Sequence, residues 1–369
     1  MKKYDYLIVG AGLFGAVCAH ELNKRGKSVL IIDKNSYIGG LCHDSVINDI
    51  PVHTYGPHIF HTSKKYIWDY ISQFADFNCY RHKVVVNYRG KIFSFPINLM
   101  TLYQLWGVSN PRDAISTIDS KRQIIDAPSN LEEWILSRVG DEIYDIFFKE
   151  YTEKQWGKKC TELPISIVDR IPIRYTFNDY YYNDCDIYSG TPRGGYTSIF
   201  EKMLSGCEIR LGVDYIDDRK HLDGITDCVI YTGEIDRLYK YIYGPLEYRS
   251  VRYEYDLLDI ADYQGVGQVN FTDMLTPYTR VIEYKHLHNI VGNSTVIAKE
   301  FVSDYNNTNP SIAPAYPINT KCNNNLYEQY FKLISHEHNM YIGGRLANYQ
   351  YYNMDKIICD ALDMVARIL

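Results

Sequence analysis

The chain of 369 residues lacks several features that would place it in other classes of protein. No stretch approaches the roughly 18 to 20 consecutive apolar residues of a membrane span, so the sequence predicts a cytoplasmic protein without a membrane partner. Positive charge is not in excess, because the net charge is −6, and this argues against nucleic-acid partners. No C-x-x-C occurs, and the 9 cysteines are scattered. Such usage is typical of reduced thiols and not of a disulfide framework or zinc site.

The first 33 residues follow the order strand, glycine turn, helix, strand and acid. An apolar run over 6–9 leads into Gly10 to Gly15, which reads G-A-G-L-F-G, and a second apolar run ends on Asp33. In a dinucleotide-binding fold, Gly10 permits the tight turn and Gly12 lets the backbone approach a pyrophosphate, while Gly15 lets the helix pack on the strand. The helix N-terminus offers N–H groups to phosphates. Asp33 can accept hydrogen bonds from ribose hydroxyls.

A pair of glycines beyond the first turn favours FAD over NAD as the expected cofactor. Gly39 and Gly40 come just after Asp33 and Lys34, and Leu41 follows them. This arrangement resembles the extended fingerprint of FAD-binding proteins of the glutathione-reductase and amine-oxidase type. In those proteins the second turn lets the chain fold back over the cofactor phosphates. A loop that contains two glycines by coincidence is the alternative.

Strand and helix patterns divide the chain into three units. Helical patterns dominate from 98 to 160, whereas residues 80–95 and the region beyond 249 alternate in the manner of strands. The apolar strand that ends at Thr232 can return to the first sheet. We therefore expect an α/β multidomain fold. Its parts are a discontinuous Rossmann-like FAD-binding domain (1–78, 194–245 and 318–369), an inserted helical domain (97–163) and an antiparallel β-sheet domain with a mobile loop (79–96, 164–193 and 246–317).

A series of collinear sequence blocks runs through all three units. Tyr55–Thr62 reads Y-G-P-H-I-F-H-T, and Tyr151–Gly157 reads Y-T-E-K-Q-W-G. Further blocks occupy 170–174, 179–181, 194–197, 247–250, 277–280 and 344–346. In this order, the blocks resemble the motifs of the UDP-galactopyranose mutase family.

The resemblance implies an FAD-dependent isomerase with no net redox reaction. Members of that family interconvert the pyranose and furanose forms of a nucleotide sugar, UDP-galactose first of all, and so supply furanose donors for surface polysaccharide. Their flavin is active when reduced: its N5 attacks the anomeric carbon and displaces UDP, and the N5–sugar adduct opens and recloses through O4. The resemblance also implies a UDP-linked substrate, a cellular reductant such as NAD(P)H or reduced flavin, and a possible homodimer.

Candidate substrate-binding residues follow from the matching positions. UDP leaves as an anion, so guanidinium groups must neutralise it, and Arg170 and Arg280 match the two arginines that hold the diphosphate in the family. Arg249 adds to the same field. Tyr151 and Trp156 match aromatic residues that pack against the uridine. The remaining expected substrate contacts are Thr152, Tyr181, Asn270, Tyr316 and Tyr351.

The Tyr55–Thr62 block lies beside the flavin in the family. A histidine there can hydrogen-bond the isoalloxazine or stabilise its reduced, anionic form, which makes His61 a candidate catalytic residue together with Arg170 and Arg280. The H-x-x-H spacing of His58 and His61 also invites a metal, but no third ligand has a useful spacing, so we expect no metal. The expected FAD-binding residues are Gly10, Gly12, Phe14, Gly15, Asp33, Lys34, Gly40, Leu41, Tyr55, Gly56, His58, Ile59, Thr232, Gly344, Arg345, Asn353 and Met354.

Departures from the family pattern leave the sugar open. Ala315 stands where the family commonly has a tyrosine that reaches the diphosphate, Asn353 stands where it has an acid, and residues 183–189 depart from its usual sequence. One lost hydroxyl contact costs only about 1 kcal/mol, so the same chemistry on UDP-arabinose, UDP-N-acetylgalactosamine or dTDP-fucose is an alternative. An amine-oxidase-like flavin oxidoreductase, which would consume an oxidant, is an alternative of another class.

Overall fold

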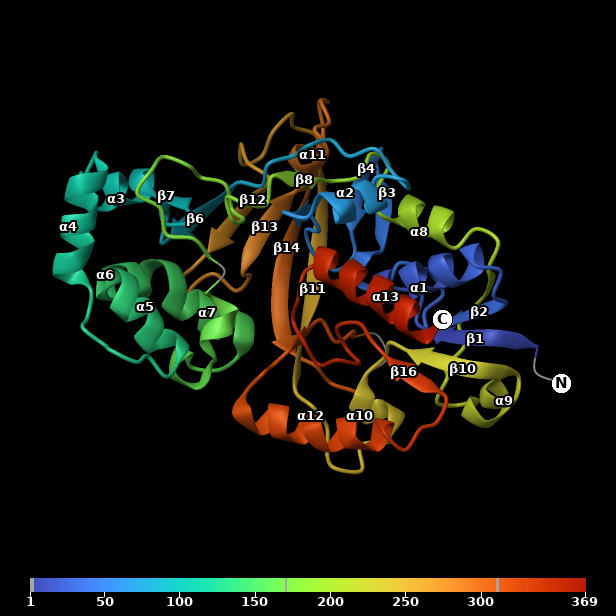
Figure 1. Cartoon of the computed structure of the whole chain (residues 1–369). Helices are drawn as coiled ribbons and strands as arrows, with labels where there is room; N and C mark the ends of the chain where they lie inside the picture. The colour runs from blue at the N-terminus through green and yellow to red at the C-terminus, as the bar shows by residue number, and fades with distance from the viewer. Residues whose placement is uncertain (1–2, 170, 310–311) are drawn as a thin grey trace.

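A five-stranded parallel sheet lies at one end of the computed structural model, which describes residues 3–169, 171–309 and 312–369 (Figure 1). Its order is β16-β10-β1-β2-β9. The strands are β1 (Tyr4–Val9), β2 (Val29–Asp33), β9 (Glu208–Leu211), β10 (Thr226–Tyr231) and β16 (Met340–Ile342). β1 and β2 are nearly continuous apolar runs because helices cover both faces of the sheet. The sheet therefore draws on the beginning, middle and end of the chain, as expected of a discontinuous nucleotide-binding unit.

Two sets of helices cover this sheet. On one face, α1, α2, α8 and α13 share a core with the side chains of Ile8 and Ile31. Leu7 and Leu30 point to the other face, where α9, α10 and α12 pack. These helices are α1 (Leu13–Lys24), α2 (Lys65–Ile71), α8 (Thr197–Met203), α9 (Arg219–Gly224), α10 (Ile235–Leu238), α12 (Lys321–Ile334) and α13 (Met354–Ile368).

A seven-stranded sheet occupies the centre of the molecule, in the order β15-β11-β14-β13-β12-β6-β7 (Figure 1). Its strands are β6 (Val84–Tyr88), β7 (Lys91–Phe95), β11 (Tyr248–Leu258), β12 (Gln268–Phe271), β13 (Arg280–Glu283), β14 (Thr295–Asp304) and β15 (Tyr316–Pro317). The expected antiparallel pairing holds except between β12 and β6, which pair in parallel. Parallel pairing requires a long connection between the two strands, and the chain between β6 and β12 is long enough to provide it.

Short elements connect the two sheets. β3 (Asp44–Ile47) pairs with β4 (Ile50–His53), and β5 (Phe60–Thr62) pairs with β8 (Tyr188–Gly190). β14 starts only at Thr295, because α11 (Tyr284–His288) precedes it and is capped by Asn289, whose φ is +54°. Short 3-10 segments lie at Gly40–Cys42, Cys160–Glu162 and Ile165–Ile167.

The helical insert lies at the end of the molecule remote from both chain termini (Figure 1). It contains α3 (Leu99–Trp106), α4 (Pro111–Lys121), α5 (Leu131–Val139), α6 (Asp141–Ile143), a π-helical segment (Tyr144–Lys149) and α7 (Glu150–Trp156). The side chains of Asn98, Asn110 and Asn130 accept backbone N–H groups and so begin α3, α4 and α5. The exact domain boundaries stay a prediction. Among the described residues, no helix has both the length and the apolar character that a membrane crossing requires.

Candidate functional site

The glycine turn after β1 is tight at its two ends and open in its middle. A Cβ on Gly10, whose φ is +111°, would lie 2.0 Å from Thr232 Oγ1, and a Cβ on Gly15 would lie 2.0 Å from the carbonyl oxygen of Gly10. Apart from its chain neighbours and the helix backbone, a Cβ on Gly12, the N-cap of α1, would approach one atom of the described residues, the Cα of Gly40 at 3.8 Å. The backbone at Gly12 is therefore open to a ligand. No acid occupies the first turn of α1, so the helix dipole remains available to an anion.

Asp33 stands at the end of β2 with its carboxylate held by backbone groups. Oδ2 accepts the N–H of Ala11 and Oδ1 accepts the N–H of Asn35, each at 2.8 Å. Burial raises the pKa of Asp33, while these two hydrogen bonds act in the opposite direction. Each oxygen keeps acceptor capacity for a ribose hydroxyl.

A cavity of about 420 Å³ runs past this turn and over the carboxyl ends of the parallel strands. We call it the cofactor groove. Of the expected FAD-binding residues it is lined by Gly10, Gly12, Phe14, Asp33, Lys34, Gly40, Leu41, Tyr55, His58, Thr232, Gly344, Arg345 and Met354. Gly15 supports the turn from beneath. Gly56, Ile59 and Asn353 line the adjoining cavity instead.

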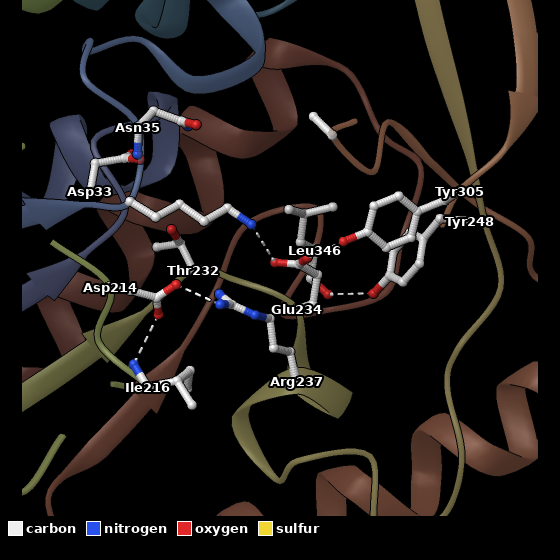
Figure 2. A network of polar contacts seen from close by, with 12 residues as sticks. Asp33, Asn35, Asp214, Ile216, Thr232, Glu234, Arg237, Tyr248, Tyr305 and Leu346 are labelled. Atoms are coloured by element: carbon white, nitrogen blue, oxygen red, sulfur yellow. Dashed lines mark hydrogen bonds and ion pairs between the residues drawn. The ribbon is translucent and has the colours of Figure 1, made fainter. Parts of the chain in front are cut away.

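Glu234, which the sequence analysis did not single out, anchors a polar network at the Asp33 end of the groove (Figure 2). Its carboxylate lies 3.5 Å from Lys34 Nζ and accepts the hydroxyl of Tyr305 at 3.0 Å. Beside it, Arg237 pairs with Asp214 at 2.5 Å. Lys34 therefore reaches across from β2 to the loop after β10. No local pattern predicts a contact between residues 200 positions apart.

The cofactor groove opens into a central cavity of about 170 Å³, which adjoins a third cavity of about 90 Å³. The groove and the central cavity share Leu41, Tyr55, His58, Arg345 and Met354. The central and third cavities share Ile171, Tyr181, Arg280, Tyr316 and Tyr351. The three spaces thus form one row from the glycine turn to the helical insert.

The third cavity is built on the last turns of the helical insert. Tyr151, Thr152 and Trp156 of α7 line it, together with Asn270 of β12. Tyr316 and Tyr351 complete an aromatic cluster, with ring centroids 5.3 Å apart and each 6.2 Å from the indole ring of Trp156. This cavity offers flat apolar faces for a base.

Arg280 stands between the central and third cavities. Its Nη2 lies 2.5 Å from Glu300 Oε2 and donates to the Tyr316 hydroxyl at 3.3 Å. Among the described residues, its Nε finds no partner although the atom is buried. Burial alone would lower the pKa of Arg280, but Glu300 and the hydroxyls of Tyr316, Tyr253 and Tyr151 together raise it well above its usual value, so the group stays charged. A buried cation with an unused donor fits an anionic ligand. Arg170, the other expected cation, lies outside the described residues.

Arg249 is placed differently from the expectation. Its Nε donates to the carbonyl of Gln155 at 3.0 Å, and its Nη1 pairs with Asp304. It lines none of the three described cavities. Arg249 therefore supports the C-terminal turn of α7, next to Trp156. Its expected contact with the substrate diphosphate stays a prediction.

Two histidines beside the central cavity, His58 and His82, are held neutral by their surroundings. His58 Nδ1 lies 2.7 Å from the carbonyl oxygen of Gly56, so this nitrogen carries the proton. Burial, and then Arg345, lowers the pKa of His58 to about 4. Burial, and then Arg280, lowers the pKa of His82 to about 3. His61 lines the same cavity. Gln268 and His82 are lining residues that sequence reasoning missed.

Lys154 was also missed, although it lies inside the Y-T-E-K-Q-W-G block. Its Nζ donates to the carbonyl oxygens of Phe271, Asp273, Thr276 and Tyr278 at 2.8 to 3.0 Å. Burial lowers its pKa to about 8. This ammonium group ties α7 to the loop between β12 and β13, which carry Asn270 and Arg280.

Comparisons with known proteins agree with this geometry. Residues 146–351 match the sequence model of the UDP-galactopyranose mutase family, and residues 8–74 match an NAD(P)-binding Rossmann-like domain. A probable UDP-galactopyranose mutase of Klebsiella pneumoniae is 36% identical over 98% of this chain and 94% of its own. The chain belongs to the UDP-galactopyranose mutase family. A dTDP-fucopyranose mutase of Escherichia coli is 34% identical over 97% of this chain and 96% of its own.

Membership in the UDP-galactopyranose mutase family confirms the predicted isomerase class over the flavin oxidoreductase. It also implies a flavin in the cofactor groove. The groove fits such a group in three ways. The backbone at Gly12 is open to a ligand, and the carboxylate of Asp33 can accept ribose hydroxyls. The buried N–H of Arg345 Nε has no hydrogen-bond acceptor among the described residues, so it can donate to the cofactor. A crystal structure of reduced UDP-galactopyranose mutase has the same fold, with a TM-score of 0.75, 16% identity and coverage of 100% of this chain and 95% of that one. A putative protoporphyrinogen oxidase from Exiguobacterium shares the fold at a TM-score of 0.66 and 11% identity, with coverage of 100% and 99%.

Proposed function

We propose that this protein interconverts the pyranose and furanose forms of UDP-galactose, with FAD bound in the cofactor groove in its reduced form. The observation that carries the proposal is the row of three connected cavities with Arg280 at the second junction. This order supports a binding mode in which a cofactor ring, a sugar and a nucleotide lie in sequence. A cytoplasmic location and a reductant such as NAD(P)H or reduced flavin complete the proposal. A homodimer is part of it only by family resemblance.

The reduced flavin supplies the nucleophile for the anomeric carbon. The chain's own residues bind and stabilise charge around it. Tyr151 and Trp156 hold the base, and Arg280 neutralises the diphosphate when it separates from the sugar.

dTDP-fucose is a second candidate substrate, since a relative at 34% identity is named for that sugar. Ala315 lines the central cavity in place of the tyrosine that in the family commonly reaches the diphosphate, so the substrate contacts at this point differ from the family pattern. A deoxy sugar needs fewer polar partners than galactose does.

The test is to reduce the purified protein with dithionite and to follow UDP-galactofuranose and dTDP-fucofuranose by chromatography. We expect the pyranose form of UDP-galactose to accumulate without consumption of reductant in proportion to product. The same sample without dithionite is the control, and it should be inactive. An enzyme that turned over neither sugar would contradict the proposal. So would bleaching of the oxidised flavin in proportion to substrate in the control without dithionite. The same assay should be repeated with UDP-arabinose and UDP-N-acetylgalactosamine as substrates.

A further inference from the structure

A histidine–aspartate pair lies on the wall of the central cavity. His61 Nδ1 lies 2.9 Å from Asp186 Oδ2, and the two side chains are 9% and 15% exposed. The ring of Tyr182 stacks on the imidazole, with centroids 3.5 Å apart and planes at 9°. All three residues line the cavity in which the sugar is expected. The imidazole is therefore fixed in position from its face and from one ring nitrogen.

The backbone also fixes this pair. His61 sits at the middle of β5, directly opposite Ser189 of β8. Asp186 precedes β8 by two residues, and its carbonyl oxygen accepts the hydroxyl of Tyr180 at 3.0 Å. The carboxylate therefore reaches the imidazole from a segment that is itself anchored on both sides.

The partner of Nδ1 decides the tautomer of His61. An ionised carboxylate only accepts hydrogen bonds, so Nδ1 carries a proton and donates it to Asp186. The neutral ring then has its lone pair on Nε2, and its charged form has an N–H there. An aspartate that orients a histidine in this way also stabilises the charged imidazole.

Asp186 belongs to residues 183–189, the stretch that departs from the usual family sequence. The family motifs of the sequence analysis therefore do not predict this pair. The neighbouring acid in the same stretch, Asp184, has a different partner: it pairs with Arg174 and is 66% exposed.

The reaction requires a proton to move between two sugar oxygens. In the pyranose, O5 is in the ring and O4 carries a hydrogen, and in the furanose these roles are exchanged. We propose that His61 relays this proton from Nε2 and that Asp186 is the positioning residue that makes the relay possible. This inference rests on the proposed function.

The balance of the relay is simple. As the C1–O5 bond breaks, its electron pair stays on O5, which takes a proton from Nε2 of the imidazolium. As O4 bonds to C1 with its own electron pair, its proton returns to Nε2 of the neutral ring. The protein gains and loses nothing over one turnover.

The experiment reads the tautomer and the turnover separately. In 15N-labelled protein at alkaline pH, long-range 1H–15N correlation spectra give the protonated nitrogen of His61, with His61→Gln identifying its signals. We expect Nδ1–H in the wild type and a switch to Nε2–H in Asp186→Asn, whose amide can donate to Nδ1. Asp186→Asn should lower kcat by about 10²-fold, the range of proton-transfer catalysis, with KM changed less than about twofold. Asp186→Glu should recover part of kcat.

Asp179→Asn is the matched control. It removes a carboxylate from the same segment, where Asp179 pairs with Lys83 at 3.0 Å and is 40% exposed. We expect wild-type kcat and an unchanged His61 signal. An Nε2–H tautomer in the wild type, or wild-type kcat in Asp186→Asn, would overturn the inference. Because the tautomer is measured in the wild type, a poorly folding variant does not remove the test. A wild type that converts no nucleotide sugar would refute the proposed function instead, and the spectra would still report the pair.

Discussion

Arg280 and Glu300 form an ion pair inside the protein, and Glu300 has no solvent exposure at all. The hydroxyls of Tyr253 and Thr279 also donate to the Glu300 carboxylate. Nη2 of the guanidinium is thus already hydrogen-bonded to protein groups, whereas the Nε–H remains available to donate to a ligand. The pair fixes the direction of the arginine as well as its charge.

Removal of this arginine should cost both stability and activity. We expect Arg280→Ala to lower the free energy of unfolding by about 3 to 5 kcal/mol, because Glu300 keeps a buried charge without a cation. In Arg280→Ala combined with Glu300→Gln, most of that stability should return and mutase activity should not. Urea unfolding and the chromatographic assay give the two quantities. Wild-type kcat in the single variant would show that Arg280 does not act on the diphosphate.

The glycine turn predicts a sharp difference between two substitutions to alanine. Gly10→Ala should abolish retention of flavin, because φ is +111° and the new Cβ would lie 2.0 Å from Thr232 Oγ1. Gly26→Ala is the control, since its φ is +76° and nothing lies within 4 Å of its Cβ. The control should lose only about 1 kcal/mol of stability and keep its flavin. The absorbance ratio of flavin to protein after gel filtration measures the difference.

Lys154 should prove structural and still affect nucleotide affinity. Lys154→Met leaves buried carbonyl oxygens without donors, each at a cost of about 1 to 3 kcal/mol, and frees α7 from the loop after β12. We expect a lower melting temperature and weaker UDP binding by calorimetry. Lys149→Met removes an ammonium group that is 47% exposed and pairs with Asp145. This change should alter stability by less than about 0.5 kcal/mol. Equal effects of the two variants would contradict the interpretation.

Stability should fall in mild acid. His58 and His82 have pKa values lowered to about 4 and about 3, below the 6.5 of an unfolded chain. The unfolded state therefore binds more protons as the pH falls, so stability is full above pH 6.5 and is lost on approach to pH 4. His82→Gln should flatten this dependence in urea titrations at a series of pH values. His338→Gln, at an exposed position, should leave it unchanged.

The sequence predicted those parts of the site whose geometry is local. Gly10, Gly12 and Asp33 belong to one strand–helix–strand unit at the start of the chain, so their spacing alone indicates the groove. The bridge from Lys34 to Glu234 and the four carbonyls around Lys154 join distant segments, and no spacing rule reaches them. At Arg249 the sequence suggested a contact with the substrate diphosphate, because its position matches a family motif. In the structure the side chain instead contacts the backbone of α7. The parallel pairing of β12 with β6 could not be predicted either, because it depends on where the chain re-enters the sheet after the long connection between them.

The groove that begins at residue 10 is finished only by the last stretch of the chain. Gly344, Arg345 and Met354 form part of its wall, and α13 packs along α1 (Figure 1). During synthesis, the ribosome tunnel therefore still conceals this wall after the fingerprint has emerged. The complete groove can form only after residues 344–354 have left the tunnel.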